Sequence, residues 1–236
     1  MNLIIRHFFR SFRLPFAVAV LLIVSGCAGK PFNLKNLAKS DVDMVADAHI
    51  QQLYIYSRDL MVKLYKRNPK ELAKQNGATV ESRLKQLAMD STDFRFTELN
   101  KLRGNDALRL AFDEEFEGDR VFALMVGIRS MQHASYGKKT EFFLLDDLDQ
   151  QKLYNSARNL EIIAWRLNNH RQTDDSLFLL SNGYQNGIAN LSFERLFGKM
   201  ISLQDMMAKI VSGKTARAIN TVFHGVASST LLPIGF

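Results

Sequence analysis

Apolar residues recur every three or four positions over most of the chain after residue 40, which is the spacing of one face of an α-helix. The clearest run extends from about residue 149 to residue 170, and its apolar positions are Leu153, Ala157, Leu160, Ala164 and Leu167. Two later runs repeat the spacing: Leu196, Met200, Leu203, Met207 and Ile210, then Ala216, Ile219, Phe223 and Val226. The alternation that marks a β-strand is nearly absent. The pattern therefore predicts an all-α fold, a single globular domain of about seven to nine helices over residues 40–236.

Residues that favour helix ends divide the first half of this domain into elements. Ser40 is a suitable N-cap, and Asp43 lies in the first turn, where a carboxylate interacts well with the positive end of a helix. This helix is expected to end near Pro69, because proline cannot continue a helix interior. Shorter helices are expected over residues 79–89 and, in two pieces, over residues 104–137.

Two segments depart from the one-sided pattern. The sequence RVFALMVGIRSM, residues 120–131, is apolar almost all round, which is typical of a central buried helix. The sequence TEFFLLD, residues 140–146, is the best candidate for a strand. Because one strand cannot form a sheet, we expect this segment to be a buried connector.

The first 27 residues have a different organisation. A basic stretch, residues 1–13, precedes eleven apolar residues, 14–24, and the small residues Ser25 and Gly26 follow. This is the layout of a secretory signal peptide. An uncleaved N-terminal anchor is the alternative, but a spanning helix needs about 20 apolar residues. The one cysteine of the chain, Cys27, comes directly afterwards.

The sequence Val24-Ser25-Gly26-Cys27 resembles the lipobox of bacterial lipoproteins. The resemblance covers residues 1–27 and implies that Cys27 receives a diacylglyceryl group, that the chain is cleaved before it, and that the new amino terminus is acylated. A buried structural thiol is the alternative. The expected organisation is a signal peptide over residues 1–26, a lipidated tether over residues 27–39 and the helical domain over residues 40–236.

Ala28, the residue after the cysteine, bears on localisation. By resemblance to sorted lipoproteins, a residue other than Asp at this position favours the outer membrane, with the domain facing the periplasm. Three acyl chains would make release negligible, since a single chain binds a membrane only reversibly. We expect this covalent lipid on Cys27 and no other cofactor.

Charge excludes one class of partner. The signal segment carries three of the 31 Lys and Arg residues. The 210 residues that remain after cleavage therefore have 28 basic and 24 acidic residues, a net charge of about +4. This modest charge is spread along the sequence, whereas a nucleic-acid-binding domain has a clustered basic face. No nucleic-acid partner is expected, and the charge is compatible with a position near anionic lipid.

Candidate chemistry is sparse. Asp43 and Asp47 share a helix face, and His49 lies close by, which makes these three residues a candidate polar site. A metal would need at least three convergent ligands, so no metal is expected. The alternative is a hydrogen-bonded histidine beside acidic residues of a helix start. The acidic run 113–119 is open to two interpretations, a general acid–base pair or a solvated helix end.

The last residues offer a candidate binding segment. Leu231, Leu232, Ile234 and Phe236 place apolar side chains near a chain end, where they could insert into a groove of a partner. The alternative is that the C-terminal region packs into the core of the domain.

Three functions remain open. The first is an outer-membrane lipoprotein whose helical domain binds an envelope protein as an accessory or scaffold. The second is a carrier or sensor of a hydrophobic ligand, in a cavity lined by some of the nine methionines and 17 phenylalanines. The third is an enzyme of unknown type, for which the sequence contains no Gly-x-Ser-x-Gly motif and no phosphate-binding loop.

Overall fold

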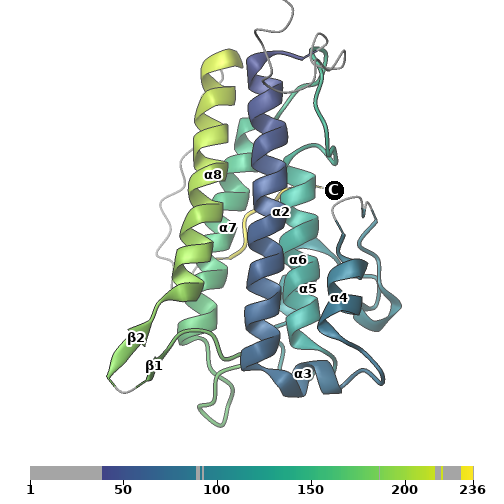
Figure 1. The fold of residues 1–236 in the computed structure, drawn as a ribbon, viewed down its shortest axis with the longest axis vertical. Coiled ribbons are helices and arrows are strands. Elements are labelled where there is room, and N and C mark those ends of the chain that lie inside the picture. Colours follow the sequence, from purple (N-terminus) through teal and green to yellow (C-terminus); the bar gives the residue numbers. More distant parts are fainter. Residues whose placement is uncertain are drawn as a thin grey trace, which may run out of the picture. The chain divides into compact units, whose positions relative to one another are not determined.

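A computed structural model of the chain describes residues 39–88, 91, 93–185, 187–215, 219 and 230–235. Within these residues there are seven α-helices, one short 3-10 helix and one antiparallel hairpin (Figure 1). The all-α prediction is confirmed, and Lys39–Phe236 forms one compact unit. The elements are α2 (Asp41–Arg67), α3 (Pro69–Ala73), α4 (Val80–Gln86), η2 (Thr97–Leu99), α5 (Gly104–Leu110), α6 (Arg120–Ser135), α7 (Gln150–Asn169), β1 (Gly183–Gln185), β2 (Ile188–Asn190) and α8 (Ser192–Thr215).

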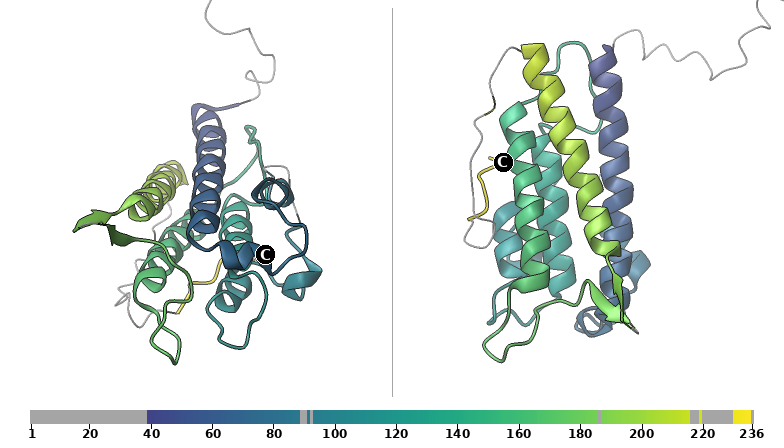
Figure 2. Two further views of the ribbon diagram at one scale, coloured as in Figure 1. Left: turned by 60° about the horizontal axis from the view of Figure 1, so that its bottom comes forward. Right: turned by 90° about the vertical axis from the view of Figure 1, so that its left-hand side faces the viewer.

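The four long helices α2, α6, α7 and α8 lie side by side (Figures 1 and 2). Helices α2 and α6 run antiparallel, because Ser57 in the middle of α2 bonds to Gln132 late in α6 (3.0 Å), and Tyr65 near the end of α2 bonds to Asp119 just before α6 (2.7 Å). The short elements α3, η2, α4 and α5 are inserted in the sequence between these two helices.

Helices α7 and α8 are also antiparallel. Arg158 in the first half of α7 pairs with Asp205 in the second half of α8, and Asn168 at the end of α7 bonds to Glu194 at the start of α8 (2.6 Å). Helix α8 packs against α2 as well. The four helices therefore alternate in direction, which is the arrangement of an antiparallel four-helix bundle.

Helix α2 begins and ends where its sequence indicates. Ser40 and Asp43 form a capping box, in which the Asp43 side chain accepts the Ser40 N–H (2.7 Å) and Ser40 Oγ accepts the Asp43 N–H (3.3 Å). At the other end, Asn68 bonds to the Leu64 carbonyl (2.8 Å), and Pro69 opens α3.

Helix α6 is the central helix of the domain, as its sequence predicts. All of its residues from Arg120 to Ser135 are buried. Its glycine, Gly127, lies so close to α5 that a Cβ at this position would be 2.5 Å from Leu108 Cγ and 2.9 Å from the Leu108 backbone nitrogen. The absence of a side chain at Gly127 thus sets the distance between α5 and α6.

Residues 140–146 were expected to form a buried connector, and this prediction is wrong for Leu144 and Leu145. Phe142 is fully buried, but Leu144 is 58% exposed and Leu145 is 98% exposed. A turn carries these two leucines away from the core: the Asp146 N–H donates to the Phe143 carbonyl (2.8 Å), and the Phe143 N–H donates to Asp146 Oδ2 (3.0 Å).

The hairpin β1–β2 is a further departure from the sequence-based expectation. It pairs Tyr184 with Ala189 and is closed at Gly187, whose φ of +78° favours glycine. Its three-residue strands are too short to show alternation in the sequence.

Several predicted features lie outside the described residues. They are the signal peptide and tether with Val24, Ser25, Gly26 and Cys27, most of the predicted helix after residue 215, and Phe236.

Candidate functional site

The three residues of the predicted polar site do not converge. Asp43 is buried and caps α2. Asp47 pairs with Lys39 and accepts the Phe142 N–H (2.8 Å), so it holds the loop after α6. His49 is half-buried and hydrogen-bonds to the Leu203 backbone on α8, and burial lowers its pKa. Each residue therefore has a separate structural contact.

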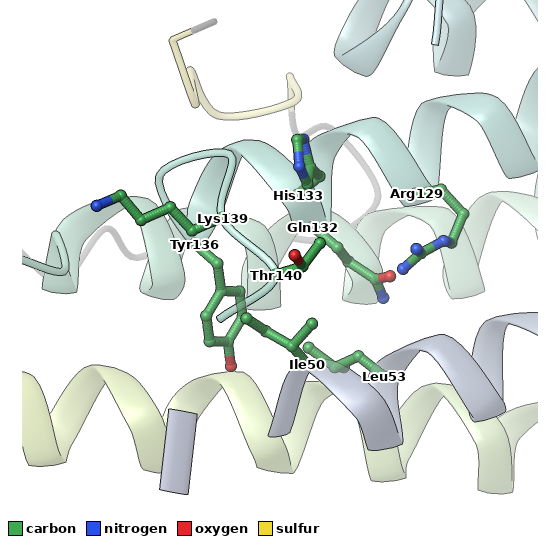
Figure 3. Close-up of a pocket in the computed structure, with 8 residues that line it drawn as sticks. All are labelled: Ile50, Leu53, Arg129, Gln132, His133, Tyr136, Lys139 and Thr140. Atoms are coloured by element: carbon green, nitrogen blue, oxygen red, sulfur yellow. The ribbon is translucent and has the colours of Figure 1, made fainter. Parts of the chain in front are cut away.

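A small pocket lies between α2 and α6, near the end of the bundle where α2 begins (Figure 3). In Figure 3, Arg129, Gln132 and Tyr136 reach from α6 toward α2, whereas His133 points to the opposite side of α6 and Lys139 points outward. The lining residues are Ile50, Leu53, Arg129, Gln132, His133, Tyr136, Lys139 and Thr140. The volume open to a water molecule is about 10 Å³, which is room for about one water.

Arg129 is the unusual member of this pocket. It is 5% exposed, and no carboxylate of the described residues pairs with it. Its Nε has no hydrogen-bond partner there, and its guanidinium lies 5.0 Å from the centre of the Tyr54 ring. Burial lowers the pKa of Arg129 to about 10, so the side chain remains a buried cation at neutral pH.

Other polar groups near Arg129 also lack partners among the described residues. Tyr136 is 1% exposed with an unpaired hydroxyl, and burial raises its pKa. His133 has an unpaired Nε2, and its pKa is lowered by burial and by the nearby charges of Arg129, Lys138 and Arg103. The pocket can therefore bind a water molecule or a very small anion. None of its eight lining residues is a carboxylate that could act as a general base.

A buried ionic cluster joins α2, α4, η2 and α6. Arg83 contacts both oxygens of Glu98 (2.6 and 2.8 Å) and lies 3.3 Å from Asp119 Oδ2. Asp119 also accepts the Tyr65 hydroxyl (2.7 Å) and the Phe122 N–H (2.9 Å), which makes it the N-cap of α6. The position of Asp119 before an apolar helix indicates its role at a helix start. Nothing in the sequence indicates its pairing with Arg83, which lies 36 positions earlier in the chain.

The acidic run 113–119 contains one buried carboxylate, Asp119, and four exposed ones. Asp119 is 1% exposed and structural, whereas Asp113, Glu114, Glu115 and Glu117 are exposed. The acidic run is mainly a solvated segment before a helix, and Glu114 uses its carboxylate to accept the Thr173 hydroxyl.

The C-terminal segment occupies the core of the domain. Leu231, Leu232 and Ile234 are 5%, 9% and 3% exposed. The Leu232 N–H donates to Asn159 Oδ1 (2.6 Å), and the Leu232 carbonyl accepts from Asn159 (2.9 Å) and from Asn105 (2.9 Å). These three apolar side chains are therefore not on a free surface, and a partner could reach them only if the segment left this position. That they bind a partner stays a prediction.

Exposed apolar side chains lie instead on and beside the hairpin, where the pairing of Tyr184 with Ala189 and of Gln185 with Ile188 puts Tyr184 and Ile188 on opposite faces. Leu180, Tyr184, Ile188 and Leu191 are 47%, 82%, 74% and 58% exposed. We call these four residues the hairpin patch. An open groove of about 350 Å³ lies beside it between α2 and α8 and is lined by Asp59, Val62, Lys63, Ser192, Arg195 and Leu196. This surface was not predicted from the sequence, because its residues come from a loop whose strands are too short to recognise.

Comparison with protein-family models, with curated proteins and with solved structures found no match. In the part of the chain that the structure describes, no helix is long and apolar enough to cross a membrane. Over the same residues, no group of three or more His, Cys, Asp or Glu side chains is placed to hold a metal ion.

Proposed function

We propose that this protein is a lipoprotein of the bacterial cell envelope, held at the outer membrane through acylated Cys27, and that its helical domain binds another envelope protein as an accessory or scaffold. The resemblance of residues 1–27 to a lipoprotein signal supports the anchor. The hairpin patch supports the binding role, because four large apolar side chains in one short segment are unfavourable in water unless something covers them.

The position of the hairpin patch fits an anchored binding protein. Gly183 of the hairpin lies beside Arg67 at the end of α2, since a Cβ on Gly183 would be 3.0 Å from Arg67 Nη2. Lys39 precedes the other end of α2. A helix of 27 residues is about 40 Å long. The patch is therefore presented at the end of the bundle opposite to the point where the tether joins the domain.

The chemistry of the surface indicates the kind of partner. Tyr184 and Ile188 offer apolar contacts, and aromatic anchors are frequent in protein interfaces. The lining of the adjacent groove contains two basic residues, Lys63 and Arg195, and one acidic residue, Asp59. We expect a partner that inserts an apolar side chain at the hairpin and presents acidic groups at the rim. Confinement of both proteins to one membrane raises their effective concentration, so a small interface is sufficient.

The other two functions gain less support. The pocket between α2 and α6 holds about one water molecule and is too small for an acyl chain. Asp43, Asp47 and His49 make separate contacts and do not form a common site.

Crosslinking in intact cells tests the proposal. A photoreactive residue placed at Tyr184 should capture one dominant envelope protein, and the same residue at Met206, which is 54% exposed in the second half of α8, should not. Replacement of Ile188 by Ser in the first variant should reduce the yield of this product while the helical circular dichroism is retained. Capture of the same abundant neighbours from positions 184 and 206 would contradict the binding role of the hairpin patch. Release of the protein from membranes by Cys27→Ser tests the anchor separately.

A further inference from the structure

The loop between α6 and α7 exposes two leucines at its tip. Leu145 is 98% exposed and Leu144 is 58% exposed, and they are adjacent in the sequence. Leu145 leaves nearly all of its apolar surface in water and Leu144 more than half, which is unfavourable. A surface that removes them from water is therefore to be expected.

The tip of this loop is held in place rather than free to collapse onto the domain. Phe142 on one side of the two leucines is fully buried, and Leu148 on the other side is 9% exposed. The Phe143–Asp146 turn lies between them, and Lys139 pairs with Asp146. The exposure of the leucines is thus built into the folded loop.

The same loop is fastened to the point where the tether enters the domain. Lys39 forms ion pairs with Asp47 of α2 and with Glu141 of the loop (Nζ to Oε1, 2.9 Å). The Lys39 ammonium also lies 4.8 Å from the centre of the Phe143 ring. The first residue of the domain and the loop that carries Leu144 and Leu145 are therefore neighbours.

The attachment point of the tether at Lys39 favours one end of the bundle for contact with the membrane. Eleven residues lie between Cys27 and Lys39, and the twelve steps from one to the other span at most about 40 Å when the chain is fully extended. The loop with Leu144 and Leu145 contacts Lys39 itself, the first described residue of the domain. The hairpin patch lies beyond the length of α2, about 40 Å further away.

From these contacts we infer that Leu144 and Leu145 insert into the lipid bilayer that holds the acyl chains of Cys27 and that they fix the orientation of the domain on it. The inference rests on the proposed lipid anchor. The occupant is the apolar interior of the membrane interface rather than anionic lipid, because the loop over residues 137–149 carries two lysines against four carboxylates. The insertion turns the hairpin patch away from the membrane, toward a partner.

A fluorescent reporter at residue 145 tests this inference. Acylated Cys27 has no free thiol, so Leu145→Cys supplies the single site for an environment-sensitive dye, and Ile188→Cys, 74% exposed at the other end of the bundle, is the matched control. Both full-length proteins are produced with their lipid, confirmed by mass spectrometry of the N-terminal peptide, and placed in vesicles of neutral phospholipid. We expect the emission at residue 145 to shift to shorter wavelength and to be quenched by a lipid whose acyl chains carry a quencher. The emission at residue 188 should show neither change.

The outcomes separate the inference from the proposed function. An acylated protein with equal emission at residues 145 and 188 would overturn the insertion and leave the anchor intact. A shift that requires anionic vesicles would also overturn it, because that dependence indicates adsorption by charge. Absence of acylation on Cys27 would overturn the anchor and the inference together. Because residue 145 is almost fully exposed, its substitution does not disturb the core, and unchanged circular dichroism verifies this.

Discussion

The single buried side chain of Asp119 links three parts of the domain, namely α2, α4 and the start of α6. Its carboxylate caps α6, accepts the Tyr65 hydroxyl and lies 3.3 Å from the Arg83 guanidinium. Burial raises the pKa of Asp119, while the Phe122 N–H, the Tyr65 hydroxyl and Arg83 act in the opposite direction. The charge is tolerated because each of these groups replaces water that the carboxylate has lost. Removing one partner would leave a buried ion without compensation.

One buried histidine, His133, and one half-buried histidine, His49, predict a pH dependence of stability. Burial lowers the pKa of both His49 and His133, and the charges of Arg129, Lys138 and Arg103 lower that of His133 further. Below the ordinary histidine pKa of 6.5, the unfolded chain binds protons that the folded protein does not. The free energy of unfolding should therefore fall as the pH decreases from about 7 to 5, by at most about 1.4 kcal/mol per pH unit for each histidine.

Urea unfolding at several pH values measures this dependence. The double variant His49→Gln with His133→Gln should have a flatter profile between pH 5 and pH 7, and each single variant should lie between it and the parent protein. A profile that keeps its full slope in the double variant would show that other groups cause the dependence.

At the scale of elements, the contact between α5 and α6 depends on one glycine. Gly127→Ala would place a Cβ 2.5 Å from Leu108 Cγ and 2.9 Å from the Leu108 backbone nitrogen, so α5 must move. We expect the free energy of unfolding to fall by about 1–3 kcal/mol, which is typical of overpacking. Gly198→Ala in α8 is the matched control, because a Cβ there meets nothing within 4 Å. It should stabilise the protein by about 0.5–1 kcal/mol through its helix propensity. Urea unfolding followed by circular dichroism measures both changes, and equal effects of the two variants would contradict the close contact.

The elements that sequence reasoning predicted well are those with local signals. The Ser40–Asp43 capping box and Pro69 define α2, and the apolar seam from Leu153 to Leu167 defines α7 within a residue or two. The hairpin and the exposed turn at residues 143–146 could not be predicted in the same way. The strands of the hairpin are too short to show alternation, and residues 140–146 have a strand-like pattern that indicated burial. Only the backbone hydrogen bonds of the folded loop decide which of its side chains face water.

The same limit applies to the candidate site. Asp43, Asp47 and His49 are close in sequence, and their spacing alone makes them a candidate for a common polar site. In the structure, Asp47 accepts a hydrogen bond from a loop residue 95 positions away, and His49 bonds to α8. Arg129, in contrast, was part of a nearly apolar helix and gave no signal of its own. Its lack of a carboxylate partner becomes visible only when the surrounding helices are in place.

At the scale of the whole molecule, the C-terminal segment joins parts of the chain that are distant in sequence. Leu232 bonds to Asn159 of α7 and Asn105 of α5, and the Pro233 carbonyl accepts from Asn155 of α7 (2.8 Å). The buried side chains of Leu231 and Ile234 belong to the main core. The segment thus covers the junction of α5 and α7.

Asn159 is the residue through which this closure can be tested. It is 0% exposed and both donates to and accepts from the Leu232 backbone. Asn159→Ala leaves the buried Leu232 N–H without a partner, so the free energy of unfolding should fall by roughly 1–3 kcal/mol. The matched control is Asn169→Ala at the exposed end of the same helix, which should change the free energy of unfolding by less than about 0.5 kcal/mol.

Deletion of residues 231–236 should destabilise the domain at least as much as Asn159→Ala. If the deletion instead left stability unchanged and reduced only the capture of an envelope protein, the segment would be a binding element that leaves the core, because a side chain that contributes to the core cannot be removed without a loss of stability.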